Sequence, residues 1–340
     1  MEININNSNP ILGICIPTYK RPNQLKLAVK SIIHAAKDHN ISIILADDST
    51  DDTNCEVITE LMGDYKFIEW HRNGVNLGID GNILNAVNLC KCKYAWLLGE
   101  DDRIIPGAIS RMLKKISEAS SPPAFICSNY SYVDEDFTMI IRESLLQIQS
   151  DCALEAEQFI QTEAWAIGFI GACVINKSVW ETVDQTRYIG TYFAHVGTIL
   201  ESIKHHKVLL LSEPSVYNRV GGASVFTWSG DTYGVYKGWD SMMALLKNTY
   251  PDQICTAGAE SFRTQTGYGT LRFLSARRAD DIYNMKVFRK DVLVNSKLST
   301  RYKMFALFIA ILPQYVLQMA RKNLNRQRKQ RGRAIVDPGL

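Results

Sequence analysis

The chain has 340 residues, of which 46% are hydrophobic and 21% are charged. This length and composition allow one large or two smaller buried cores and exclude disorder over most of the chain. A net charge of +3 is too small to indicate a nucleic-acid-binding protein by itself.

Strand-like and helix-like segments alternate over the first hundred residues. Short apolar, β-branched runs predict strands at residues 11–16, 41–46, 67–70 and 94–98. Apolar residues at three- and four-residue spacing predict helices at residues 25–36, 55–62 and 82–90. Such alternation is typical of a mostly parallel sheet with helices on both faces. After residue 102 the alternation loosens, and from about residue 231 the pattern is mainly helical.

Cysteine usage and apolar segments bear on the compartment of the protein. The eight cysteines are scattered, and no second pair at zinc-site spacing accompanies Cys90 and Cys92, so we expect reduced thiols in a cytoplasmic protein. Residues 1–10 lack the basic and apolar regions of a signal peptide. Residues 304–320 approach the length of a membrane span, but Pro313 interrupts them, and we expect no transmembrane helix.

Three predicted strands end in polar runs. They are P-T-Y-K-R at residues 17–21, D-D-S at 47–49 and E-D-D at 100–102. Each run alone has an ordinary explanation, as a proline-terminated strand, a helix-capping turn or an acidic loop before a helix. Parallel strands end at one edge of a sheet, where open α/β folds bind ligands, and adjacent carboxylates repel unless a cation lies between them and a phosphate. Together the runs favour a metal-assisted nucleotide site.

These motifs also support a family resemblance. The set I-C-I-P-T-Y-K-R-P, A-D-D-S-T-D-D-T and G-E-D-D resembles the family 2 glycosyltransferases over residues 10–220. The resemblance implies a GT-A fold, a mostly parallel sheet flanked by helices, in residues 1–225. It also implies inverting transfer of a sugar from a nucleotide-sugar donor to an acceptor, with Mg²⁺ or Mn²⁺. Residues 226–340 would form a helical C-terminal region with a basic, membrane-proximal tail.

The resemblance assigns roles to individual residues of the donor site. One group would surround the base and ribose: Pro17, Thr18, Tyr19 and, just after them, Arg21. An acid of the D-D pair would contact the base edge, but the usual following glycine is absent, so Asp47 and Asp48 both stay candidates. Residues of the N-x-G loop and of the R-V-G-G-A-S segment would line the donor and its diphosphate: Asn76, Gly78, Arg219 and Ser224. Asp101 and Asp102 resemble the metal-binding pair, with Asp102 the direct ligand.

The catalytic base is the main departure from the family pattern. Most members have an acid about ninety residues after the metal motif, but residues 188–197 contain none and instead include His195. A neutral imidazole is a competent base near pH 7, although a buried, structural histidine is an equally good interpretation. Asp184 and Glu201 are the reserve candidates.

The last part of the chain predicts contact with a membrane surface rather than a transmembrane helix. Residues 304–319 are apolar, and residues 321–333 carry seven lysines or arginines and no acid. Such a pair predicts association with an anionic membrane surface, and a core helix with a solvated tail is the alternative. A nucleic-acid-binding tail is a second alternative, but no aromatic interleaving or RNA-binding motif supports it, so we expect no nucleic-acid partner.

Residues 188–191 with His195 and Val196 resemble bacterial O-antigen 3,6-dideoxyhexosyltransferases such as abequosyltransferases. The acceptor would then be a polyprenyl-diphosphate-linked glycan at the inner face of the cytoplasmic membrane. Two other functions stay open. A nucleotidyltransferase usually has a Gly-rich basic loop after the first strand, which this chain lacks, whereas a nucleotide-sugar-binding module without catalysis would explain the missing acid.

Overall fold

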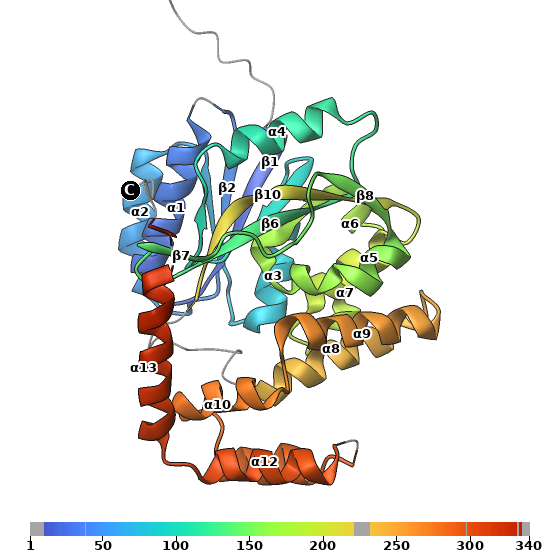
Figure 1. The fold of residues 1–340 in the computed structure, drawn as a ribbon. Helices are drawn as coiled ribbons and strands as arrows, with labels where there is room; N and C mark the ends of the chain where they lie inside the picture. The colour runs from blue at the N-terminus through green and yellow to red at the C-terminus, as the bar shows by residue number, and fades with distance from the viewer. Residues whose placement is uncertain (1–9, 38, 221–231, 297, 332, 335–340) are drawn as a thin grey trace, which may run out of the picture.

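The computed structural model describes residues 10–37, 39–220, 232–296, 298–331 and 333–334 (Figure 1). Its centre is a four-stranded parallel sheet in the order β4-β1-β2-β3. The strands are β1 (Leu12–Thr18), β2 (Ser42–Asp47), β3 (Ile68–Arg72) and β4 (Tyr94–Leu97). The helices between them are α1 (Pro22–Ala36), α2 (Cys55–Asp64) and α3 (Gly78–Leu89). The predicted alternation is thus confirmed for this part of the chain.

The sheet continues beyond β4 through strands that are far apart in sequence. They are β5 (Arg103–Ile104), β6 (Phe125–Val133), β7 (Met139–Arg142), β8 (Cys152–Glu155), β9 (Cys173–Asn176), β10 (Lys207–Arg219) and β11 (Arg333–Ala334). β9 lies antiparallel between β4 and β6, and β10 runs parallel to β6. The end of β10 also pairs antiparallel with β5, where Tyr217 lies opposite Arg103. This pairing places the last residue of β10, Arg219, beside the acidic run that follows β4.

Short helices connect and cover these strands. They are α4 (Ala108–Glu118), α5 (Ala156–Thr162), α6 (Lys177–Trp180) and α7 (Ala194–Ser202), with 3-10 turns at η1 (Asp52–Asn54), η2 (Ala164–Gly168), η3 (Ile170–Ala172) and η4 (Gln185–Tyr188). All eight cysteines are free thiols.

Two hydrophobic cores divide the molecule differently from the predicted boundary at residue 225. The large core includes residues of α8 (Thr232–Leu246) and α9 (Asp252–Thr266), such as Trp239 and Phe262, because these helices pack on the α7 side of the sheet domain. The second core is formed by α10 (Leu271–Ala279), α11 (Met285–Val287), the π-helical turn Phe288–Leu293 and α12 (Thr300–Ile311). The packing boundary among the described residues therefore falls after α9.

The helices α10 and α12 lie at one end of the molecule, and α13 (Gln314–Arg331) packs against α10 and rises along the side of the molecule to β7 (Figure 1). No single helix in the described ranges is both long enough and apolar enough to cross a membrane. The α12 helix and Gln314–Asn323 meet the length and composition criteria only together, as a pair bent by 94°.

Candidate active site

The carboxyl ends of β1, β2 and β4 are hydrogen-bonded to one another. The hydroxyl of Thr18 and the backbone N–H of Tyr19 both donate to Oε2 of Glu100. The side-chain amide of Asn82, on α3, donates to the carbonyl of Ala46 at 3.0 Å and to that of Thr18 at 3.4 Å. The polar strand ends that the sequence placed at one edge of the sheet therefore form one connected network.

Asp102 is the most deeply buried acid of the E-D-D run, with 5% of its surface exposed. Its Oδ1 accepts the backbone N–H of Arg219 at 3.2 Å, and Oδ2 lies against Gly99, where a Cβ would collide with it. Burial, with the neighbouring Asp101 charge, raises the pKa of Asp102 well above its usual range. A nearby cation would stabilise the charged form of a carboxylate in this environment.

Two guanidinium groups converge on Asp101. Arg21 Nη1 lies 3.3 Å and Arg219 Nη2 lies 3.0 Å from the same oxygen, Oδ2. Burial raises the pKa of Glu100 to about 7, although its hydrogen bonds and Arg21 oppose the shift. The edge thus carries three acids and two arginines, a composition that suits both a cation and phosphate oxygens.

The D-D pair holds the loop before α3. Oδ1 of Asp48 accepts the N–H of Leu77 at 2.7 Å, and Oδ2 accepts the N–H of Gly78 at 3.1 Å. The side chain of Asn76 also accepts from Gly78, whose φ of 71° favours glycine. Asp47 accepts from Ser49 N–H through Oδ1, while its buried Oδ2 has no partner among the described residues. Asp48 therefore shapes the N-x-G loop, and the acid that meets the base edge stays undecided between the two.

The three candidate bases lie in different environments. His195, at the start of α7, is 2% exposed; its Nε2 donates to the carbonyl of Ile167, and Nδ1 has no partner in the described part of the chain. Because burial disfavours the imidazolium, the pKa of His195 falls to about 4. The ring is therefore neutral and enclosed, which fits a packing role better than contact with an acceptor. Its assignment as the base stays a prediction.

The reserve candidates are engaged in local structure. Asp184 caps η4 by accepting from the N–H and hydroxyl of Thr186. Glu201 pairs with Arg187 at 3.1 Å and accepts from the hydroxyl of Tyr188. No hydrogen bond or ion pair among the described residues joins either acid to the E-D-D run. Ser224 lies outside the described residues.

Sequence reasoning missed Asp80. This buried acid in the first turn of α3 accepts the backbone N–H groups of Gly190, Tyr192 and Ala194, at 2.8, 3.0 and 3.2 Å. In the sequence it is indistinguishable from an acid that stabilises its own helix N-terminus. In the structure it fixes the loop that leads into α7, while the residues just before it contact Asp48.

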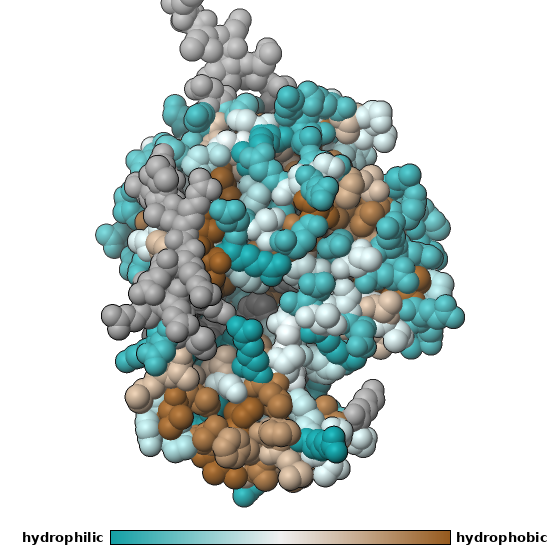
Figure 2. Space-filling model, viewed as in Figure 1, coloured by the Kyte–Doolittle hydropathy of each residue, from teal (hydrophilic) through white to brown (hydrophobic). Residues whose placement is uncertain are grey.

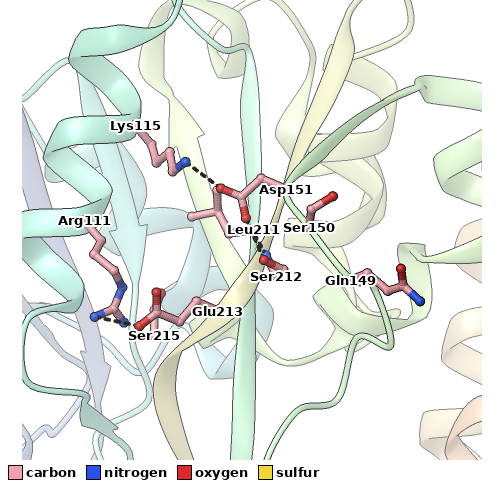
Figure 3. A pocket seen from close by; sticks show the side chains of 9 residues that line it. All are labelled: Arg111, Lys115, Gln149, Ser150, Asp151, Leu211, Ser212, Glu213 and Ser215. Carbon is pink, nitrogen blue, oxygen red and sulfur yellow. Dashed lines mark hydrogen bonds and ion pairs between the residues drawn. The ribbon is translucent and has the colours of Figure 1, made fainter.

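A surface pocket between α4 and β10 is separate from this site (Figure 3). Lys115 pairs there with Asp151 at 2.7 Å, and Arg111 pairs with Glu213 at 3.2 Å. The pocket contains none of the predicted site residues, and its two cations are already neutralised.

A divalent ion at this edge would need ligands from substrate phosphates and water in addition to those from the protein. Across the described ranges, no group of three or more His, Cys, Asp or Glu side chains is placed to hold a metal. Mg²⁺ in phosphoryl sites commonly uses one or two carboxylates, with substrate phosphates and water completing its shell. Asp101 and Asp102 fit that requirement, since Asp102 is buried beside a second acid.

Comparison with known proteins decides the family. The model of glycosyl transferase family 2 matches residues 13–183, half of the chain and the part that carries all four parallel strands. The chain belongs to glycosyltransferase family 2. This glycosyltransferase has the expected GT-A fold: it is similar to S. aureus TarS 1–349, solved with UDP and with UDP-GlcNAc, at TM-scores of 0.54 and 0.55. The identity is 13%, over 92% of this chain and 91–92% of TarS 1–349.

Two characterised relatives have similar sequences. Abequosyltransferase RfbV of Salmonella typhimurium is 26% identical over 62% of this chain and 66% of its own length, just under two thirds. The GalNAc(5)-diNAcBac-PP-undecaprenol beta-1,3-glucosyltransferase of Campylobacter jejuni is 23% identical over 70% of this chain and 75% of its own length. The family 2 assignment and the similarity to two named sugar transferases thus agree with the sequence motifs.

Proposed function

We propose that this enzyme transfers a sugar, with inversion and with the help of Mg²⁺ or Mn²⁺, from a nucleoside-diphosphate donor to a lipid-linked glycan. The observation that carries the proposal is the meeting of Asp101 and Asp102 with Arg21 and Arg219 at the joined ends of β1, β2 and β4. A nucleoside diphosphate leaves with at least two negative charges. The two arginines, with a cation held by the two aspartates, would stabilise that charge.

The donor would lie across the strand ends. Thr18 and Tyr19 would flank the nucleoside, and the loop held by Asp48 would line the other side. Asp102, with Asp101, would hold the metal, which supplies charge neutralisation for the leaving diphosphate. Asp101 is one-third exposed, so its two ion pairs are partly screened, and the arginines can exchange it for phosphate oxygens.

The acceptor is proposed from the relatives. One is named an abequosyltransferase and another acts on an undecaprenol-diphosphate-linked glycan, which supports a lipid-linked O-antigen or other surface-glycan acceptor here. A 3,6-dideoxyhexose such as abequose is the finer proposal for the sugar. The enzyme would then work as a peripheral protein at the inner face of the cytoplasmic membrane.

A donor panel tests this proposal. The change is Asp102→Asn, with Asp64→Asn, an exposed acid of α2, as the control. We expect UDP-, CDP- or GDP-sugars to raise the melting temperature of the wild type with Mn²⁺ and not with EDTA, because a ligand stabilises the state that binds it. Asp102→Asn should abolish the Mn²⁺-dependent part and lower kcat about a hundred-fold or more.

The alternatives give different outcomes in the same assay. A binding module would show the melting shift without sugar transfer. A nucleotidyltransferase would release inorganic diphosphate from a nucleoside triphosphate. If no nucleotide-sugar stabilises the protein, or if Asp102→Asn matches the wild type in Mn²⁺-dependent shift and turnover, the site assignment is wrong.

A further inference from the structure

The outer face of α12 is apolar although its inner face is already packed. Ala306, Ile309 and Ala310 are buried in the second core, and the carbonyl of Ala306 accepts from the hydroxyl of Tyr283. On the other side of the same helix four large apolar side chains are between 58% and 66% exposed: Met304, Phe305, Phe308 and Ile311. A surface helix normally places polar residues there. The outer face is therefore not an unfilled part of the core but a second apolar surface.

This surface continues past the bend into α13. Tyr315 and Met319 are 63% and 62% exposed. The bend itself is fixed, because Arg278 Nε donates to the carbonyl of Leu312 and the amide of Gln314 donates to that of Ala279, both at 3.1 Å. Figure 2 shows hydrophobic residues gathered at the end of the molecule where α12 lies. We call the six exposed side chains the apolar cap: Met304, Phe305, Phe308, Ile311, Tyr315 and Met319.

The segment that carries the apolar cap has basic side chains and no acidic ones, and the acid that reaches it from another element, Asp280, pairs with Arg321. The sequence has no Asp or Glu between Asp291 and Asp337, and this stretch contains ten lysines or arginines. Arg301 and Lys322, close to the two ends of the apolar cap, are exposed. Pairing of two copies through this face would bring like charges together, which opposes self-association. An anionic lipid surface matches both the apolar cap and its cationic surroundings.

The geometry also favours lying on a membrane over crossing it. The only candidate span in the described ranges is the pair bent by 94°, and straightening it would pull α12 away from the second core. A helix that lies on the membrane surface inserts only its apolar face into the headgroup boundary, so α12 would keep its contacts with the second core.

We infer that the apolar cap docks this enzyme on anionic lipid bilayers, with its side chains at the headgroup boundary and the surrounding lysines and arginines on lipid phosphates. The inference rests on the proposed function, since a lipid-linked acceptor resides at that surface. It identifies α12 as the element that contacts the bilayer, and this contact sets the orientation of the enzyme on the membrane. The sheet domain stands above the bilayer on α10, α12 and α13.

Vesicle binding of the full chain tests the inference. Sedimentation with vesicles of phosphatidylcholine containing about a third phosphatidylglycerol should bring down the wild type, and pure phosphatidylcholine should bind it at least about ten-fold more weakly. Phe305→Ser with Phe308→Ser should lower the partition coefficient about ten-fold or more, because both rings are exposed and lie outside the second core. Arg301→Gln with Lys322→Gln should weaken binding several-fold and reduce its salt dependence.

The matched control is Met62→Ser with Phe67→Ser, which removes two apolar side chains that are 42% and 43% exposed in α2 and just before β3, outside the apolar cap. This control should bind vesicles like the wild type. Equal binding of the Phe305→Ser/Phe308→Ser variant and the wild type would overturn the inference. So would light scattering that shows a wild-type dimer broken by that variant while vesicle binding persists. No sugar enters this assay, so its result is independent of the donor panel, and either proposal can fail alone.

Discussion

At the scale of single residues, the three acids after β4 have different neighbours and different tasks. Glu100 joins the end of β1 to the end of β4 through Thr18 and Tyr19, a role that the sequence did not indicate. Asp101 holds the two arginines, and Asp102 is buried against the backbone of Arg219. One acid thus organises the edge, and the other two are those that we propose to act with a cation on the diphosphate.

The titration of His195 should contribute to the pH dependence of stability, in the direction opposite to that of Glu100, whose pKa is raised to about 7. The folded-state pKa of about 4 lies below the ordinary value of 6.5, so between these pH values the unfolded chain takes up a proton that the folded chain does not. Stability from this group is therefore complete above pH 6.5 and is lost as the pH falls toward 4, by about 3 kcal/mol in total.

The variant His195→Gln should lack this contribution, so its stability relative to the wild type should rise as the pH falls, as measured by urea unfolding at several pH values between 4.5 and 7.5. Exposed His205→Gln is the control and should keep the wild-type slope. Because the ring is enclosed, we also expect His195→Gln to retain kcat within about ten-fold at a temperature where it is folded. A loss of a hundred-fold or more in kcat, with donor binding intact, would instead identify His195 as the base.

At the scale of elements, α3 connects the joined strand ends with the loop that leads into α7. Its preceding loop is held by Asp48, and its first turn holds the loop into α7 through Asp80. That second loop contains Gly190 and Tyr192 at positive φ and packs against α8 so closely that a Cβ at Gly238 would collide with the carbonyl of Thr191. A displacement of α3 would therefore be transmitted to both loops.

Replacing Asp80 by Asn tests this connection. Asn has one acceptor oxygen for three N–H donors, so we expect a loss of about 1–3 kcal/mol in the free energy of unfolding. We also expect a lower kcat with little change in donor KM, since Asp48 and its loop are untouched. Exposed Asp64→Asn is the control. Equal loss of donor affinity and kcat would show that Asp80 supports the whole fold rather than the loop before α7.

At the scale of the whole molecule, two cores of unequal size support the two surfaces to which we assign proposed functions. The large core supports the joined ends of β1, β2 and β4, where we propose that the donor binds. The second core supports α12 and its exposed face. Phe288 is buried in the second core and is not a member of the large core.

The variant Phe288→Ala should therefore separate the two units. A large-to-small change of this kind costs about 3–5 kcal/mol, here within the second core. Hydrogen exchange should show faster opening of residues 271–311 and vesicle binding should weaken, while the nucleotide-dependent melting shift stays. The half-exposed Leu27→Ala on α1 is the control. Loss of the nucleotide-dependent shift in Phe288→Ala would mean that the cores unfold as one.

Local sequence patterns sufficed for the first hundred residues, because each parallel strand there is a short apolar run that ends in a polar motif. The pairing of β9 between β4 and β6, and of β10 with β5, could not be predicted. These contacts join residues far apart in the chain, and periodicity carries no information about partners. Arg219 was identified from its local motif, but its place beside Asp101 and Asp102 depends on that pairing.

The sequence by itself determined the family, the GT-A fold and the edge at which the polar strand ends meet, because these follow from patterns within single segments. Only the tertiary structure decided that Glu100 and Asp80 organise the site and that His195 is enclosed, since burial and hydrogen-bond partners arise when distant segments pack. It also showed how the residues of α12 divide between core and surface, while the contact of residues 304–319 with a membrane stays a proposal. One face of α12 belongs to a core and the other is exposed, a distinction that its continuous apolar run, residues 304–311, does not encode.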